Sequence, residues 1–131
     1  MHFFLTMEPP TKTQQEHGIG KRKNGSFYVY EDQDLKMARA KIYDAVSKFA
    51  PDEPMTGPIR LLVKWIFPRG KHKDGTYKTT KPDTDNLNKM LKDEMTKAGF
   101  WKDDALVASE IIEKFWADRP GIYIEIERLI C

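Results

Sequence analysis

The most constraining feature of the sequence is an apolar run that lies between two prolines. Residues 59–67 read IRLLVKWIF, with Pro58 before the run and Pro68 after it. Runs in which both alternating sets of side chains are largely apolar are typical of strands buried within a sheet. We therefore expect a central strand at 59–67, and the fold has to supply neighbours on both of its sides.

The rest of the pattern alternates between strand-like and helix-like segments. Apolar residues recur at helical spacing over 34–49 and 84–98, and Gly99 follows the second helix as a stop. Strands are expected at 2–7, 26–30, 106–116 and 122–127, and 11–25 is expected to be a loop. A turn at residues 119–121 predicts that the last two strands form an antiparallel hairpin. The predicted class is α+β (mixed α/β): a single small domain over 1–131, with one mixed sheet and two helices packed on one face.

Length and cysteine content exclude several classes of protein. A chain of 131 residues fits one domain with one core, so a catalytic site that needs two sides would take the second from a partner subunit. Cys131 is the single cysteine, which excludes an intrachain disulfide and argues against a cysteine metal site. No apolar run approaches about 20 residues, and the opening MHFFLTMEPP lacks the basic segment of a signal peptide. We therefore expect a cytoplasmic protein without a membrane span.

Basic residues gather in two places, although the formal net charge is only +2. The first cluster is Lys21, Arg22 and Lys23. The second lies in the glycine-bearing stretch 69–82, which we expect to be an exposed, mobile loop. Its members are Arg69, Lys71, His72, Lys73, Lys78 and Lys81. Such runs are either solvated loops or sites for a polyanion, and the second run leads directly into an acidic cluster.

Four aspartates form two acidic clusters around the helix expected at 84–98. Asp83 and Asp85 stand at its start, and Asp103 and Asp104 precede the strand expected at 106–116. One interpretation is structural, because Asp is a favoured N-cap and stabilises the positive end of a helix. The other is catalytic, because convergent carboxylates bind Mg²⁺ for phosphodiester hydrolysis. The clusters could meet at one end of the sheet if strand 106–116 lies beside the central strand.

Lys89 lies four residues after Asp85 and therefore on the same face of the helix. A surface ion pair between the two explains this spacing. An ammonium that contacts the scissile phosphate explains it equally well. Composition and spacing alone leave the structural and the catalytic interpretations open.

Residues 81–107, KPDTDNLNKMLKDEMTKAGFWKDDALV, resemble the signature of the RusA family of Holliday junction resolvases. The shared features are an Asp-x-Asp-Asn-Leu opening, a helix, and a closing Asp-Asp pair after an apolar or Trp position. The resemblance implies a homodimeric endonuclease that depends on Mg²⁺, with Mn²⁺ as an alternative ion. It also implies the reaction, which is a pair of nicks in a four-way DNA junction.

The same resemblance implies roles for individual residues in a catalytic segment over 83–104. Asp83, Asp85 and Asp104 match the catalytic, metal-binding aspartates, and Lys89 matches the essential lysine. Asp103 matches the neighbouring acidic position and is a candidate for a further metal ligand. We expect the basic clusters to neutralise DNA phosphates. The candidate DNA-binding residues are Lys21, Arg22, Lys23, Arg69, Lys71, Lys73, Lys78 and Lys81.

Two alternatives to a junction resolvase remain. One is a structure-tolerant nuclease of the same family that acts on flap or branched DNA. The other is a catalytically silent module that binds junctions, with aspartates that only cap and pair. The three aspartates together with Lys89 favour an enzyme, because a binding module has no use for carboxylates that face phosphate.

Overall fold

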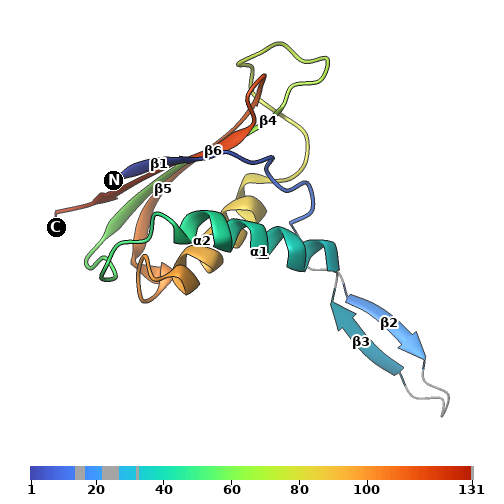
Figure 1. Cartoon of the computed structure of the whole chain (residues 1–131), viewed down its shortest axis with the longest axis horizontal. Coiled ribbons are helices and arrows are strands. Elements are labelled where there is room, and N and C mark those ends of the chain that lie inside the picture. The colour runs from blue at the N-terminus through green and yellow to red at the C-terminus, as the bar shows by residue number, and fades with distance from the viewer. Residues whose placement is uncertain (14–16, 22–26, 32, 131) are drawn as a thin grey trace.

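A computed structural model describes residues 1–13, 17–21, 27–31 and 33–130, with side chains described for 1–13 and 33–130. A four-stranded mixed sheet carries two helices on one face (Figure 1), which confirms the predicted architecture. Neither described helix is long and apolar enough to cross a membrane. The elements in chain order are β1 (His2–Leu5), β2 (His17–Lys21), β3 (Phe27–Glu31), α1 (Gln33–Ser47), β4 (Ile59–Pro68), α2 (Thr84–Ala98), the 3₁₀ turn η1 (Asp104–Leu106), β5 (Val107–Ala117) and β6 (Gly121–Arg128).

The strand predicted to be central, β4, lies between β5 and β6. The sheet order is β1-β6-β4-β5, in which β4 pairs in parallel with β5 and antiparallel with β6. The prediction that the last two strands form a hairpin is therefore wrong. The connection between them crosses the end of β4, because the most apolar strand takes the position in which both of its edges are paired.

A second difference concerns residues 11–25, which were predicted to form a loop. The structure has a strand at β2, and β2 pairs with β3 antiparallel as a separate two-stranded sheet. The sequence of β2, HGIGK, contains one branched apolar residue between two glycines. That composition lacks the alternation from which a strand is predicted.

The core lies between the sheet and the two helices. Alternate residues of β4, from Ile59 to Phe67, are buried on the helix side, and Trp65 among them is fully buried. α2 contributes Leu87, Leu91 and Met95 at the spacing of one helical face. No helix of the described residues lies on the opposite face of the sheet, so the sheet has one covered face and one open face (Figure 1).

The predicted and observed bounds of α2 agree, and its C-terminal end has a clear cause. Gly99 adopts a left-handed conformation with φ 94°, and its N–H bonds to the carbonyl of Thr96 at 3.1 Å. Glu94, which is buried, accepts a hydrogen bond from Arg39 of α1 at 3.0 Å. This ion pair joins the two helices and holds α2 in place over the sheet.

Replacement of Gly121 by Ala should destabilise the fold. A Cβ at this position would lie 2.1 Å from Phe4 Cζ and 2.8 Å from the carbonyl oxygen of Leu5, so β1 and β6 would have to move apart. Overpacking of this kind costs about 1–3 kcal/mol in the free energy of unfolding, which urea denaturation measures. An unchanged denaturation midpoint would show that β1 can shift without a loss of stability.

Candidate active site

Asp83 and Asp85 stand at the N-terminal end of α2, and both side chains are exposed. Asp83 is the N-cap through its backbone, since its carbonyl oxygen accepts the N–H of Leu87 at 3.1 Å. Its side chain makes no capping hydrogen bond. Capping therefore does not account for the carboxylate of Asp83, and this group faces solvent where a ligand can reach it.

Lys89 projects from the same part of α2, and its side chain is 73% exposed. Among the described residues its ion pair is with Asp93, at 3.5 Å, and not with Asp85. An i,i+4 ion pair at the surface stabilises a helix by only about 0.2–0.5 kcal/mol. The ammonium is therefore accessible, and it lies near Asp93, one turn farther along α2.

Asp103 and Asp104 lie beyond the C-terminal end of α2. The side chain of Asp103 accepts the N–H of Ala105 at 2.9 Å and so caps η1. Trp101 is buried and donates its indole N–H to Thr96 at 2.8 Å, which fixes this connection against the end of α2. Asp104 is half-buried and begins η1. The structural interpretation therefore accounts for Asp103 but gives Asp104 no capping role.

A charged hollow of about 500 Å³ surrounds this second acidic cluster. It brings carboxylates and cations from both helices and from the connection after α2 to one place. The lining residues are Arg39, Asp93, Thr96, Lys97, Lys102, Asp103 and Asp104. Each lining residue carries a polar or charged side chain, as a site that meets a hydrated, charged ligand would need.

α2 separates the two acidic clusters within one chain. Its 15 residues span about 22 Å at the rise of an α-helix. Because β5 runs parallel to β4, Asp104 lies at the opposite end of the sheet from the point where β4 feeds the segment 69–82. Within the described part of the chain, no three acidic, histidine or cysteine side chains are grouped so that they could hold a metal ion. The expectation that both clusters meet at one end of the sheet is therefore wrong for a single chain.

One lysine of the basic segment, Lys78, is buried rather than exposed. Its side chain lies over the ring of Trp116, with Nζ 4.1 Å from the ring centroid, and Nζ donates to the hydroxyl of Thr80 at 2.6 Å. Burial, and secondly the nearby charge of Lys114, hold the pKa of Lys78 below its usual value of 10.5. The backbone N–H of Lys78 also bonds to the carbonyl of Lys114 at 2.9 Å, so the segment lies along β5.

Lys114 of β5 holds the backbone that leads into Asp83. Its ammonium donates to the carbonyl oxygens of Thr80 and Pro82, both at 2.7 Å. The peptide bond between Lys81 and Pro82 is cis. The sequence analysis did not single out Lys114. A signal was present, because Lys114 alternates along β5 with Ile112 and Trp116, which pack against the core.

If Asp83 is a metal ligand of a DNA endonuclease, as the resemblance implies, replacement of Lys114 by Met should slow cleavage by about 10- to 100-fold, the usual effect of losing a group that orients a ligand. The carbonyls before Asp83 would lose their shared donor, so Asp83 would be held less firmly. We expect kcat to fall while the affinity for DNA changes little, and Lys114→Arg to restore part of the rate. Lys92→Met is the matched control, since Lys92 pairs with Glu110 of β5 at 2.6 Å. Equal losses in both variants would contradict a positioning role.

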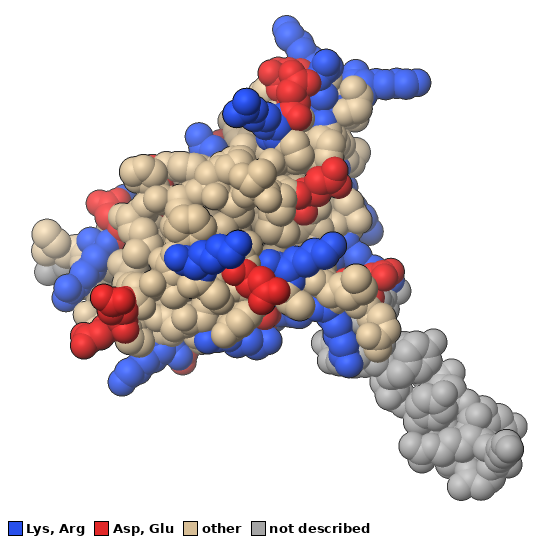
Figure 2. Space-filling view, in the orientation of Figure 1, with Lys and Arg blue, Asp and Glu red and all other residues tan. Residues whose placement is uncertain are grey.

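Figure 2 shows basic side chains at its top, where the segment 69–82 reaches its tip, together with acidic ones, and further basic side chains elsewhere on this face. Arg69 pairs with Asp118, and its guanidinium also donates to the carbonyl of His72 at 3.1 Å. The exposed lysines of the segment are Lys71, Lys73 and Lys81. The side chains of Lys21, Arg22 and Lys23 lie outside the described residues.

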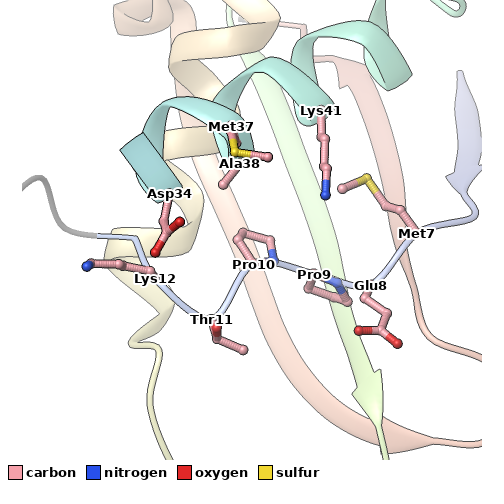
Figure 3. A pocket seen from close by; sticks show the side chains of 10 residues that line it. All are labelled: Met7, Glu8, Pro9, Pro10, Thr11, Lys12, Asp34, Met37, Ala38 and Lys41. Carbon is pink, nitrogen blue, oxygen red and sulfur yellow. The ribbon is translucent and has the colours of Figure 1, made fainter. Parts of the chain in front are cut away.

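A polar hollow of about 170 Å³ adjoins Asp83. Asn86 of α2 lines one side of it, and Thr11 and Thr13 of the N-terminal segment line the other. A larger hollow of about 430 Å³ also reaches Thr11 and lies between the N-terminal segment and α1, where Figure 3 shows Lys41 extending toward Pro9 and Glu8. The N-terminal segment thus forms a wall of the site, a role that the sequence analysis did not assign to it.

Comparison with known proteins identifies the family. The family model described as endodeoxyribonuclease RusA matches residues 8–127, which include both acidic clusters and Lys89. The chain belongs to the RusA family. A crossover junction endodeoxyribonuclease rusA of Lactococcus phage r1t is 29% identical over 125 residues, which are 95% of each chain. An uncharacterized protein, YqaN of Bacillus subtilis (strain 168), is 26% identical over 122 residues, covering 84% of this chain and 85% of that one. RusA membership confirms the resemblance of residues 81–107 and makes the chain an endodeoxyribonuclease.

Proposed function

We propose that the chain is a Mg²⁺-dependent endonuclease that resolves Holliday junctions by paired nicks and acts as a homodimer. The observation that carries the proposal is the pair of exposed carboxylates, Asp83 and Asp85, at the start of α2, with the exposed Lys89 on the same helix. The side chain of Asp83 makes no capping hydrogen bond, and Lys89 pairs with Asp93 and not with Asp85. Membership in the RusA family supports the reaction class. The phage relative is named a crossover junction endodeoxyribonuclease, which supports the branched substrate.

The distance between the acidic clusters supports a dimer. One chain has two half-sites, with Asp83 and Asp85 at one end of α2 and Asp104 beyond the other end. A two-fold axis that sets α2 antiparallel to its copy brings the start of one helix to the end of the other. In such a dimer, each complete site combines Asp83 and Asp85 with Asp104 of the partner subunit. A junction offers two symmetry-related cleavage points, which a dimer with two sites matches.

The donor set fits Mg²⁺, which prefers carboxylate oxygens and keeps part of its water shell. Asp83, Asp85 and Asp104 would hold the ion, and Asp103 is partly engaged in capping η1. When bound, Mg²⁺ makes a water more acidic and polarises the phosphodiester. Lys89 adds a positive charge where negative charge develops in the transition state.

The exposed cations of the segment 69–82 would bind phosphates away from the cut. Lys71 and Lys73 stand at its tip, and Lys81 lies next to Asp83. Contacts of this kind depend strongly on salt and do not read sequence. We assign Lys78 to the support of the segment, because its ammonium lies over Trp116. Lys21, Arg22 and Lys23 remain candidates for phosphate contacts.

The test compares a four-way junction, a flap and a linear duplex at one salt concentration, with Mg²⁺ and with EDTA. We expect cleavage of the junction at two symmetric positions, with little cleavage of linear duplex and none in EDTA. Equal cutting of all three substrates would indicate the structure-tolerant nuclease. Binding of the junction without any cutting in Mg²⁺ or Mn²⁺ would indicate the silent module.

A further inference from the structure

The hollow of about 170 Å³ beside Asp83 brings two distant parts of the chain together. The N-terminal segment forms one of its walls, and the start of α2 forms the other. Its polar lining residues are Thr11, Lys12, Thr13, Lys81, Asp83 and Asn86. Asp83 and Lys81 have roles in the proposed function, whereas the two threonines and Asn86 have none.

Four of these residues carry hydrogen-bond donors that no other described residue uses. The donors are the hydroxyls of Thr11 and Thr13, the side-chain amide of Asn86 and the ammonium of Lys81. None of these four groups makes a hydrogen bond or an ion pair with a described residue. Thr13 and Asn86 are also half-buried. Because polar groups withdrawn from water usually have a partner, unpartnered donors around one hollow indicate a ligand that accepts hydrogen bonds.

Both walls are held in place, so the donors stand at fixed positions. Pro9 and Pro10 precede Thr11, and their rings fix the backbone φ angle. Pro9 is buried, and Figure 3 shows the segment passing alongside α1 before it reaches Thr11. On the other wall, Lys114 donates to the carbonyl oxygen of Pro82 at 2.7 Å. A site that is already formed binds its ligand without the cost of ordering the chain.

The charges of the hollow favour an anion over a metal ion. Two ammonium groups, those of Lys12 and Lys81, and one carboxylate, that of Asp83, belong to its lining. The N-terminal end of α2 adds the partial positive charge of a helix start. Lysine, threonine and asparagine side chains are among the usual donors to DNA phosphates. A phosphodiester oxyanion therefore fits the hollow better than a cation does.

We propose that this hollow binds the phosphate next to the scissile one on the cut DNA strand. The inference rests on the proposed function, in which Asp83 and Asp85 hold the ion that acts on the scissile phosphate. Successive phosphates of one strand are about 3.4 Å apart along the axis of duplex DNA, so the neighbouring phosphate is within reach of a hollow that adjoins Asp83. Thr11 and Thr13 are then positioning residues, because they hold the strand in register with the metal site without touching the reacting phosphate.

Neutral phosphate analogues test the proposal. Each junction of a series carries one methylphosphonate, which lacks the negative charge, at a different position near the crossover. Binding is measured in EDTA at one salt concentration, so the result does not depend on cutting. We expect the analogue next to the cut to weaken binding by the parent protein by about 10- to 100-fold, as the loss of hydrogen bonds to a charged group does.

The double variant Thr11→Val, Thr13→Val removes both hydroxyls and keeps the branched shape of the side chains. It should bind the unmodified junction more weakly, again by about 10- to 100-fold, and should lose most of its sensitivity to the analogue at that one position. Thr56→Val is the matched control, since Thr56 is exposed in the connection between α1 and β4 and does not line the hollow. It should bind every junction of the series as the parent does.

Three results would overturn the proposal. One is a double variant that is as sensitive as the parent at every position. Another is a loss of sensitivity at a phosphate that is not next to the cut. The third is a double variant that keeps the parent's sensitivity but needs more Mg²⁺ for cutting, which would show that the hollow holds a metal ion.

The proposed function fails in a different way. A parent protein that binds the junction without cutting it, and whose sensitivity at one phosphate disappears in the double variant, would support the hollow as a phosphate site and contradict the nuclease. A parent protein that makes paired cuts, together with a double variant of unchanged sensitivity, would contradict the hollow and leave the nuclease standing.

Discussion

We expect replacement of Asp85 by Asn to lower kcat for Mg²⁺-dependent junction cleavage by at least about 100-fold. The amide is close to the carboxylate in shape but carries no charge, so the site loses one of the oxygens that would hold Mg²⁺. Affinity for the junction should stay the same or increase, because the change removes a negative charge that faces phosphate. Single-turnover cleavage and binding at one fixed salt concentration measure the two effects separately.

Asp44→Asn is the matched control, since Asp44 is an exposed aspartate of α1 outside both acidic clusters. It removes the same charge and should cut at the parent rate. An Asp85→Asn variant that cuts as fast as this control would show that Asp85 does not hold the catalytic metal. Loss of cleavage together with a comparable loss of affinity would instead place Asp85 in DNA binding or folding.

Mixing two inactive variants should restore activity. In a dimer formed from Asp85→Asn and Asp104→Asn, one site carries both lesions and the other carries neither. Random assortment makes half of the dimers mixed, each with one intact site, so about a quarter of the parent's sites become active. The product should be single nicks and not paired ones. Gel analysis of junctions labelled on each strand measures both the yield and the kind of product.

A mixture of Asp83→Asn and Asp85→Asn is the control for this experiment. Both lesions lie in the same half-site, so every site in the mixed dimer is damaged and no activity should return. Restoration in neither mixture, after subunit exchange has been verified, would place all three aspartates of a site in one chain. The two mixtures therefore distinguish a shared site from two separate ones without a structure of the complex.

The local structure could be predicted well from the sequence, whereas the pairing of strands could not. α2 begins and ends where its apolar spacing and Gly99 predict, and β4 is the central strand that residues 59–67 indicate. The turn at residues 119–121 was also recognised as a turn. The sequence does not reveal that this turn crosses the end of β4, because strands that follow each other in the chain are paired in most folds. Here β4 takes the place between β5 and β6, and that depends on which strand is buried at the centre of the sheet.

In the candidate site, too, the residues could be picked out from the sequence, whereas their arrangement in space could not. The types and spacing of Asp83, Asp85, Asp104 and Lys89 mark them as candidates, and their catalytic roles are predicted from the resemblance to the RusA family. Their separation by α2 depends on the parallel pairing of β4 with β5, which is a long-range property. The burial of Lys78 and the contacts of Lys114 depend on how the segment 69–82 lies along β5. The residues of that segment show no periodicity from which this arrangement along β5 could be predicted.

The number of residues in α2 has a consequence for where the DNA is cut. In the proposed dimer the two sites lie near the two ends of the paired α2 helices, so the length of the helix sets the distance between the two cuts. That length is about 22 Å, which equals the rise of about six base pairs of duplex DNA. An insertion of four residues, close to one helical turn, would lengthen the helix by about 6 Å while nearly preserving its buried face. Such a variant should still fold, yet it should hold its two cuts too far apart to act as a pair.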